Sequence, residues 1–196
     1  MHFILLDFLA AVPYLAHYAI PVLYPVFLYL IDRLELVQQF YRMLGLTMWG
    51  HYAIWLVLPT LPPWALDFMA VGQKTGANQT ALAQAILVAH KEGSAFARID
   101  SFTGRLFFYG MFVGNPVPFG SFPSGHVAWP MCILLTLPVN LRQRFSVYVV
   151  WVAWATLYTG HHYVLDIGGA IVLVAAIARL VGYATLAQSR CPVLPL

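Results

Sequence analysis

Five apolar runs, each about as long as a membrane-crossing helix, dominate this 196-residue chain. They are residues Tyr14–Ile31, Met43–Leu61, Val127–Leu141, Phe145–Gly160 and Ile167–Ala187. A helix needs roughly 17–25 residues to cross the hydrocarbon core of a bilayer, because it rises about 1.5 Å per residue. Only 9% of the residues are charged and the mean hydropathy is +0.77, whereas soluble domains carry about 25% charged residues. The sequence therefore predicts an integral membrane protein, an all-α bundle of about five or six transmembrane helices.

The first run contains Pro21 and Pro25. A membrane helix tolerates proline where neighbouring helices supply donors to the carbonyls that it leaves free. Residues 3–12 precede this run, either as a separate interfacial helix or as its continuation. No repeat or low-complexity segment divides the chain, so we predict one domain over residues 1–196, with a long loop at 62–125.

The connections between the last three runs predict which side of the membrane each loop occupies. Val127–Leu141 follows the stretch FPSGH, turns at RQR (142–144), and the next run returns to the starting side. The segment HHYVLD (161–166) is then expected to face FPSGH at the same membrane surface. The positive-inside rule assigns RQR to the cytoplasm. Both motifs and the loop 62–125, with its glycosylation sequon at Asn78, are thus predicted to face a lumen or the exterior.

His162 and Asp166 are the first candidates for chemistry. They are four residues apart, so one helical turn places both side chains on the same face. A carboxylate that accepts a hydrogen bond from one imidazole nitrogen fixes the tautomer and leaves the other nitrogen free to attack phosphorus. It also stabilises the cation that forms. The alternative is a capping pair at the start of the last helix.

The stretch Pro123-Ser124-Gly125-His126 runs directly into a predicted helix. Backbone N–H groups and the positive end of the helix dipole point outward there, an arrangement that binds phosphate. Gly125 lets the backbone approach closely, Ser124 offers a hydroxyl, and His126 can protonate a leaving oxygen. The alternative is a simple turn with an incidental histidine.

Lys91 and Arg98, in the stretch KEGSAFARID (91–100), form a third candidate group. They lie seven residues apart and are predicted to clamp phosphate oxygens, Arg98 through a bidentate grip. The alternative is a solvated loop with ordinary charges. Together, the three groups predict a phosphoryl-transfer site on one side of the membrane that needs no metal or other cofactor.

Other functions fit the sequence less well. His126, His162 and Asp166 could bind zinc, but no HExxH or cysteine pair supports this. Ser124 does not lie in a G-x-S-x-G elbow, which argues against a serine hydrolase. The net charge of +3 is spread along the chain, so we expect no nucleic-acid partner. His17 and His51 lie within apolar runs, and we interpret them as hydrogen-bonded packing residues.

At these residues the chain resembles the type 2 phosphatidic acid phosphatase (PAP2) superfamily. Three family motifs match Lys91-x6-Arg98, Pro123-Ser-Gly-His126 and His162-x3-Asp166. The chain is also similar to the fungal inositol phosphorylceramide synthase branch, the catalytic subunit targeted by aureobasidin. This likeness is carried by the strings PPW (62–64), FARID (96–100), PVPFGSFPSGH (116–126) and WATLYTGHHYVLDIGG (154–169).

The resemblance implies a PAP2-like helical bundle in the Golgi membrane with a lumenal active site. It implies His162 as the nucleophile that forms a phosphohistidine, Asp166 as its orienter and His126 as the acid, while Lys91, Arg98, Ser124 and Gly125 hold the phosphate. The implied reaction moves phosphoinositol from phosphatidylinositol to ceramide, with a small regulatory membrane subunit as a further partner. The alternatives are a PAP2-type phosphatase for a lipid phosphate or isoprenoid diphosphate, and a non-enzymatic membrane scaffold that retains the fold.

Overall fold

The computed structural model describes residues 4–63, 66, 95–105, 107–113 and 120–182, and in these residues every regular element is an α-helix. The helices are α1 (Ile4–Leu30), α2 (Leu34–Val57), α5 (Ala95–Thr103), α6 (Phe107–Val113), α7 (Gly125–Thr136), α8 (Val139–Tyr158) and α9 (Val164–Leu180). The predicted all-α class is therefore confirmed. Residues 3–12 are not a separate element, since α1 runs continuously from Ile4.

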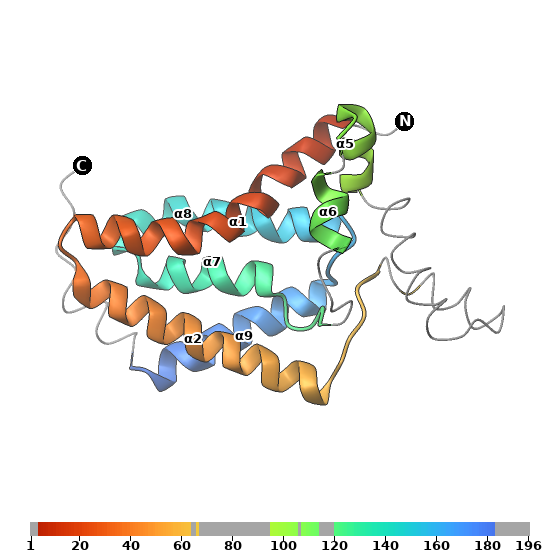
Figure 1. The fold of residues 1–196 in the computed structure, drawn as a ribbon. Helices are drawn as coiled ribbons and strands as arrows, with labels where there is room; N and C mark the ends of the chain where they lie inside the picture. The colour runs from red at the N-terminus through yellow and green to blue at the C-terminus, as the bar shows by residue number, and fades with distance from the viewer. Residues whose placement is uncertain (1–3, 64–65, 67–94, 106, 114–119, 183–196) are drawn as a thin grey trace.

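Helix α7 lies at the centre of the bundle and packs against α1, α2, α8 and α9 (Figure 1). The five long helices alternate in direction, so α1, α7 and α9 begin at the end of the bundle where α2 and α8 finish. The short helices α5 and α6 lie over this end, beside the start of α1. This arrangement brings the loops before α7 and α9 to one surface.

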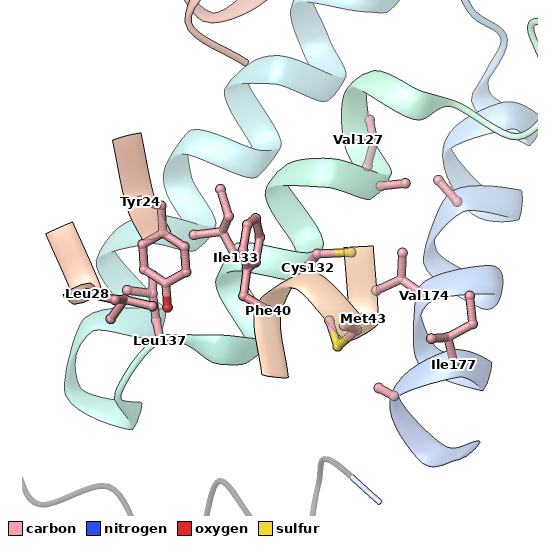
Figure 2. Close-up of a cluster of buried hydrophobic side chains, with 13 residues drawn as sticks. Tyr24, Leu28, Phe40, Met43, Val127, Cys132, Ile133, Leu137, Val174 and Ile177 are labelled. Atoms are coloured by element: carbon pink, nitrogen blue, oxygen red, sulfur yellow. The ribbon is translucent and has the colours of Figure 1, made fainter. Parts of the chain in front are cut away.

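The core around α7 combines small side chains with larger ones such as Phe40 and Tyr24, contributed by four helices (Figure 2). Ala128 and Cys132 of α7 and Ala170 of α9 are fully buried. Small residues let helix backbones approach closely, which supplies much of the packing energy in membrane bundles. Gly50 of α2 acts in the same way, because a Cβ there would come within 2.9 Å of the Leu173 side chain.

Many large apolar side chains point away from the bundle. Trp49 and Leu56 of α2, Val147 of α8 and Val172 of α9 are all largely exposed, as expected for surfaces that face lipid. Within the described residues, α1 alone passes the combined test of length and apolarity for a bilayer crossing. The number and bounds of the membrane crossings therefore stay predictions.

Helix α1 contains Pro13, Pro21 and Pro25 and bends part-way along its length (Figure 1). A proline at position 13 cannot donate to the carbonyl of Leu9, four residues earlier. The indole Nε1–H of Trp151 in α8 donates to that carbonyl instead, at 3.1 Å. A neighbouring helix thus supplies a donor to the carbonyl that Pro13 leaves free.

The predicted turn at RQR (142–144) is wrong. These residues lie inside α8, and the chain reverses at Leu137 and Pro138. Proline ends the preceding helix because it disfavours helical geometry in the residue before it. Arg142 has a different role, since its guanidinium donates to the carbonyls of Leu137 and Leu135 at 2.9 and 2.8 Å. It thereby satisfies carbonyl groups at the C-terminus of α7.

Trp151→Phe removes the indole N–H that donates a hydrogen bond to the Leu9 carbonyl. We expect the free energy of unfolding to fall by about 1 kcal/mol, measured by thermal unfolding in detergent micelles. In a Pro13→Ala background, the restored backbone N–H can serve the same carbonyl, so Trp151→Phe should cost less. Equal losses in the two backgrounds would mean that the indole contributes by packing alone.

Candidate active site

Two histidines from separate parts of the chain meet at the end of the bundle where α7 and α9 begin. His126 lies in the first turn of α7, and His162 lies in the linker between α8 and α9. Nδ1 of His126 is 3.0 Å from Nε2 of His162, and the ring centroids are 5.2 Å apart. The prediction that the two motifs face each other at one surface is therefore confirmed.

The carboxylate of Asp166 holds His162 in place. Its Oδ2 accepts hydrogen bonds from His162 Nδ1 at 3.2 Å, from the Tyr163 backbone N–H at 2.8 Å and from the Ser121 hydroxyl at 3.0 Å. Asp166 is almost fully buried, so these donors replace its lost hydration. The sequence analysis left open whether this residue orients the histidine or caps the last helix. In the structure it does both.

With both rings neutral, this network assigns the proton on each of them. An ionised carboxylate only accepts, so Nδ1 of His162 carries the proton and its Nε2 carries a lone pair. The contact between the rings then requires Nδ1–H on His126 as the donor. Nε2 of His126 is buried with no partner. Within the described residues, no three His, Cys, Asp or Glu side chains come together in a way that would hold a metal ion.

The backbone N–H groups of the turn before α7 were predicted to point outward, and the structure agrees with this only in part. The backbone N–H of Ser124 does not point outward but donates to the Asp166 carbonyl at 3.0 Å. Its hydroxyl, in a residue that is 0% exposed, has no partner. The first-turn N–H groups of α7 lack acceptors within the helix. A Cβ at Gly125 would meet no atom within 4 Å, so the glycine leaves open space beside His126.

The loop that leads into this turn is fastened to the end of α2 and to α9. The carbonyl of Thr60 accepts the Gly120 N–H at 2.8 Å, and its hydroxyl accepts the Phe122 N–H at 2.8 Å. The ring of Phe122 packs so closely on Gly169 of α9 that a Cβ there would lie 2.4 Å from it. Sequence reasoning missed both Thr60 and Ser121, since no spacing rule links Thr60 to Phe122 or Ser121 to Asp166.

Helix α1 supplies two aromatic rings that cover His126. The ring centroids of Tyr14 and His17 lie 4.4 and 4.3 Å from that of His126. The interpretation of His17 and His51 as hydrogen-bonded packing residues is confirmed, because each is buried and bonds a backbone carbonyl of its own helix, that of Tyr14 or Thr47. The contact of His17 with His126 was not predicted.

The predicted basic clamp of Lys91 and Arg98 stays a prediction, because the structure describes only one of the two residues. Lys91 lies outside the described residues, as does Asn78. Arg98 in α5 forms a bidentate ion pair with Asp7 of α1, with Nε–Oδ2 and Nη2–Oδ1 distances of 2.8 and 2.6 Å. The hydrogen bonds and negative charge of Asp7 raise the pKa of Arg98 above its usual value.

The matching family model is described as the PAP2 superfamily, and it covers residues 2–180. The chain belongs to the PAP2 superfamily. Membership of this superfamily and the apolar composition together make the chain an integral membrane protein.

Three curated proteins are similar to this PAP2 chain. The inositol phosphorylceramide synthase catalytic subunit of Schizosaccharomyces pombe is 32% identical, over 86% of this chain and 38% of the relative. The inositol phosphorylceramide synthase of Candida albicans is 26% identical (94% and 38%), and the catalytic subunit of Saccharomyces cerevisiae is 28% identical (91% and 43%). The PAP2 chain thus spans about two fifths of the length of these relatives. No solved structure matches it.

Gly169→Ala tests the contact that holds the loop before α7. The added methyl would collide with the Phe122 ring, so we expect a loss of about 1–3 kcal/mol in the free energy of unfolding, typical of overpacking. Gly168→Ala is the matched control, because a Cβ there meets nothing within 4 Å. It should be neutral or slightly stabilising. Similar melting temperatures for the two variants would contradict this packing.

Proposed function

We propose that this chain is a lipid phosphotransferase in which His162 is the nucleophile. The observation that carries the proposal is the line of contacts from Asp166 through His162 to His126. A carboxylate, an oriented imidazole and a second imidazole are the groups that a phosphohistidine mechanism requires. The names of the three similar proteins agree with it.

In the proposed first step, the phosphate of the donor lipid binds at the first turn of α7, beside Ser124 and Gly125. When the phosphate binds, contacts with the substrate replace the hydrogen bond between His126 and His162. Nε2 of His162 attacks phosphorus, the N–P bond forms, and the bond from phosphorus to the diacylglycerol oxygen breaks. His126 enters this step as the imidazolium and gives its proton to that oxygen. Asp166 stabilises the positive charge on His162.

In the second step, an acceptor hydroxyl attacks the phosphorus. His126, now neutral, takes the hydroxyl proton, and the N–P bond breaks to release His162. The names of the relatives support a ceramide-like lipid as the acceptor of a phosphoinositol group, and we propose phosphatidylinositol as its donor. We propose a Golgi location with the site facing the lumen, Lys91 and Arg98 as further phosphate ligands, and a small regulatory membrane subunit as a partner.

A hydrolase is the second candidate, with a lipid phosphate or isoprenoid diphosphate as substrate. The open space at Gly125 favours it, because a water molecule next to His126 would replace the lipid hydroxyl as acceptor. The two reactions share the first step and differ only in what attacks the phosphohistidine. A membrane scaffold without turnover is a further outcome that the following assay detects.

The assay supplies the purified protein with phosphatidylinositol labelled in its phosphoinositol group, with and without ceramide. Label in a ceramide product supports the transferase, whereas labelled water-soluble inositol phosphate supports the hydrolase. No turnover of any lipid supports the scaffold.

His162→Ala should reduce either activity by about 10³-fold or more, since it removes the nucleophile. Asp166→Asn keeps the size of the side chain but loses the charge that orients His162, and it should also lose most activity. Gly168→Ala serves as the control and should retain wild-type turnover. Full activity in His162→Ala would remove this histidine from the mechanism.

A further inference from the structure

Asp7 is a buried carboxylate that the proposed mechanism does not use. It is the only acidic residue of α1 and is 0% exposed. Its Oδ1 accepts hydrogen bonds from Arg98 Nη2 at 2.6 Å and from the Tyr158 hydroxyl at 2.7 Å, and its Oδ2 accepts one from Arg98 Nε at 2.8 Å. Asp7 therefore joins α1 to α5 and to the end of α8.

The geometry of this pair leaves part of the Arg98 guanidinium available. Arginine carries five N–H donors in a planar fork, and Asp7 occupies the edge formed by Nε and Nη2. Nη1 and the second hydrogen of Nη2 point away from that edge. The Arg98 side chain is 32% exposed while the Asp7 side chain is 0% exposed. The outer edge of Arg98, beside which Tyr158 also lies, is thus the part of the guanidinium that Asp7 does not occupy.

Contacts on the other face of α5 tie Arg98 to the histidine pair. Phe96, two residues earlier, is buried against Tyr14, with ring centroids 4.7 Å apart. Tyr14 in turn covers His126. Asp7 and Tyr14 are seven residues apart in α1 and therefore lie on one face of that helix. The same face of α1 holds both Arg98 and the ring of His126.

We propose that Asp7 is a positioning residue that orients Arg98 so that its free edge binds the phosphate of the substrate. The inference rests on the proposed function, in which Arg98 is a phosphate ligand. Asp7 then acts on Arg98 as Asp166 acts on His162. In each case, a buried carboxylate fixes one side of a cationic or ionisable group and directs the other side to the ligand.

The test measures inhibition by inorganic phosphate, KM for the donor lipid, kcat and thermal unfolding. Asp7→Asn keeps the shape of the side chain but weakens its hold on Arg98. We expect KM and the inhibition constant for phosphate to rise about 10-fold, with a smaller change in kcat, whereas Asp7→Glu should recover most of the binding. Unchanged phosphate inhibition and KM in Asp7→Asn would overturn the inference.

Exchanging the charges of Asp7 and Arg98 distinguishes a positioning role for Asp7 from a purely structural role. The double variant Asp7→Arg with Arg98→Asp can rebuild an ion pair between α1 and α5. If the pair only braces the helices, the exchange restores thermal stability, KM and phosphate inhibition together, and the inference fails. If Arg98 binds phosphate, stability recovers relative to the single variants but phosphate inhibition stays lost.

Asp100 provides a matched control on the same helix. Its carboxylate accepts the backbone N–H groups of Phe108 and Tyr109 at the start of α6 and lies two residues from Arg98. Asp100→Asn should lower the melting temperature without changing phosphate inhibition. A rise in the inhibition constant equal to that of Asp7→Asn would mean that any disturbance of α5 weakens binding, and would overturn a specific role for Asp7.

Stabilisation by inorganic phosphate distinguishes this inference from the proposed function. Phosphate should raise the melting temperature of wild type and of His162→Ala, but not that of Asp7→Asn. If His162→Ala remains active while phosphate protection still depends on Asp7, the proposed mechanism fails and the inference stands. If phosphate protects Asp7→Asn as well as it protects an active wild type, only the inference fails. A wild type that neither turns over nor binds phosphate overturns both.

Discussion

The hydrogen bonds of Asp166 hold the whole site together. Its carboxylate accepts hydrogen bonds from Ser121 in the loop before α7 and from two consecutive residues, His162 and Tyr163, in the linker between α8 and α9. Its backbone carbonyl accepts the N–H of Ser124. One residue therefore binds both motifs, through its side chain and its main chain. A displacement of Asp166 would therefore change the distance between His126 and His162.

Buried carboxylates follow a common rule in this apolar chain. Asp7, Asp100 and Asp166 are each buried near the end of the bundle that carries the histidines, and each is met by several N–H or O–H donors. An unpaired charge in such surroundings costs far more than the few kcal/mol by which a fold is stable. The three carboxylates consequently fix the relative positions of the short helices, the loops and the long helices.

The sequence was sufficient for the helical class and for the meeting of the two motifs, because long apolar runs and the order of loops determine both. It was insufficient for contacts between distant residues. Ser121 and Asp166 are separated by 45 positions and Asp7 and Arg98 by 91, and no periodic pattern links such pairs. The turn before α8 was misplaced because the arginines indicated a side of the membrane, whereas Pro138 determines where the helix breaks.

The direct contact between the two imidazoles has a consequence for the proposed reaction. In the proposed reaction the attacking lone pair is engaged by the enzyme's own acid whenever no substrate is bound. In this reaction the lone pair on His162 Nε2 is occupied by the hydrogen bond to His126. An electrophile that forms no hydrogen bond with His126 would have to break that bond without replacing it. A phosphodiester has oxygens that engage one ring while the phosphorus meets the other. If the proposed mechanism holds, this contact therefore favours reaction with phosphoryl groups over other electrophiles.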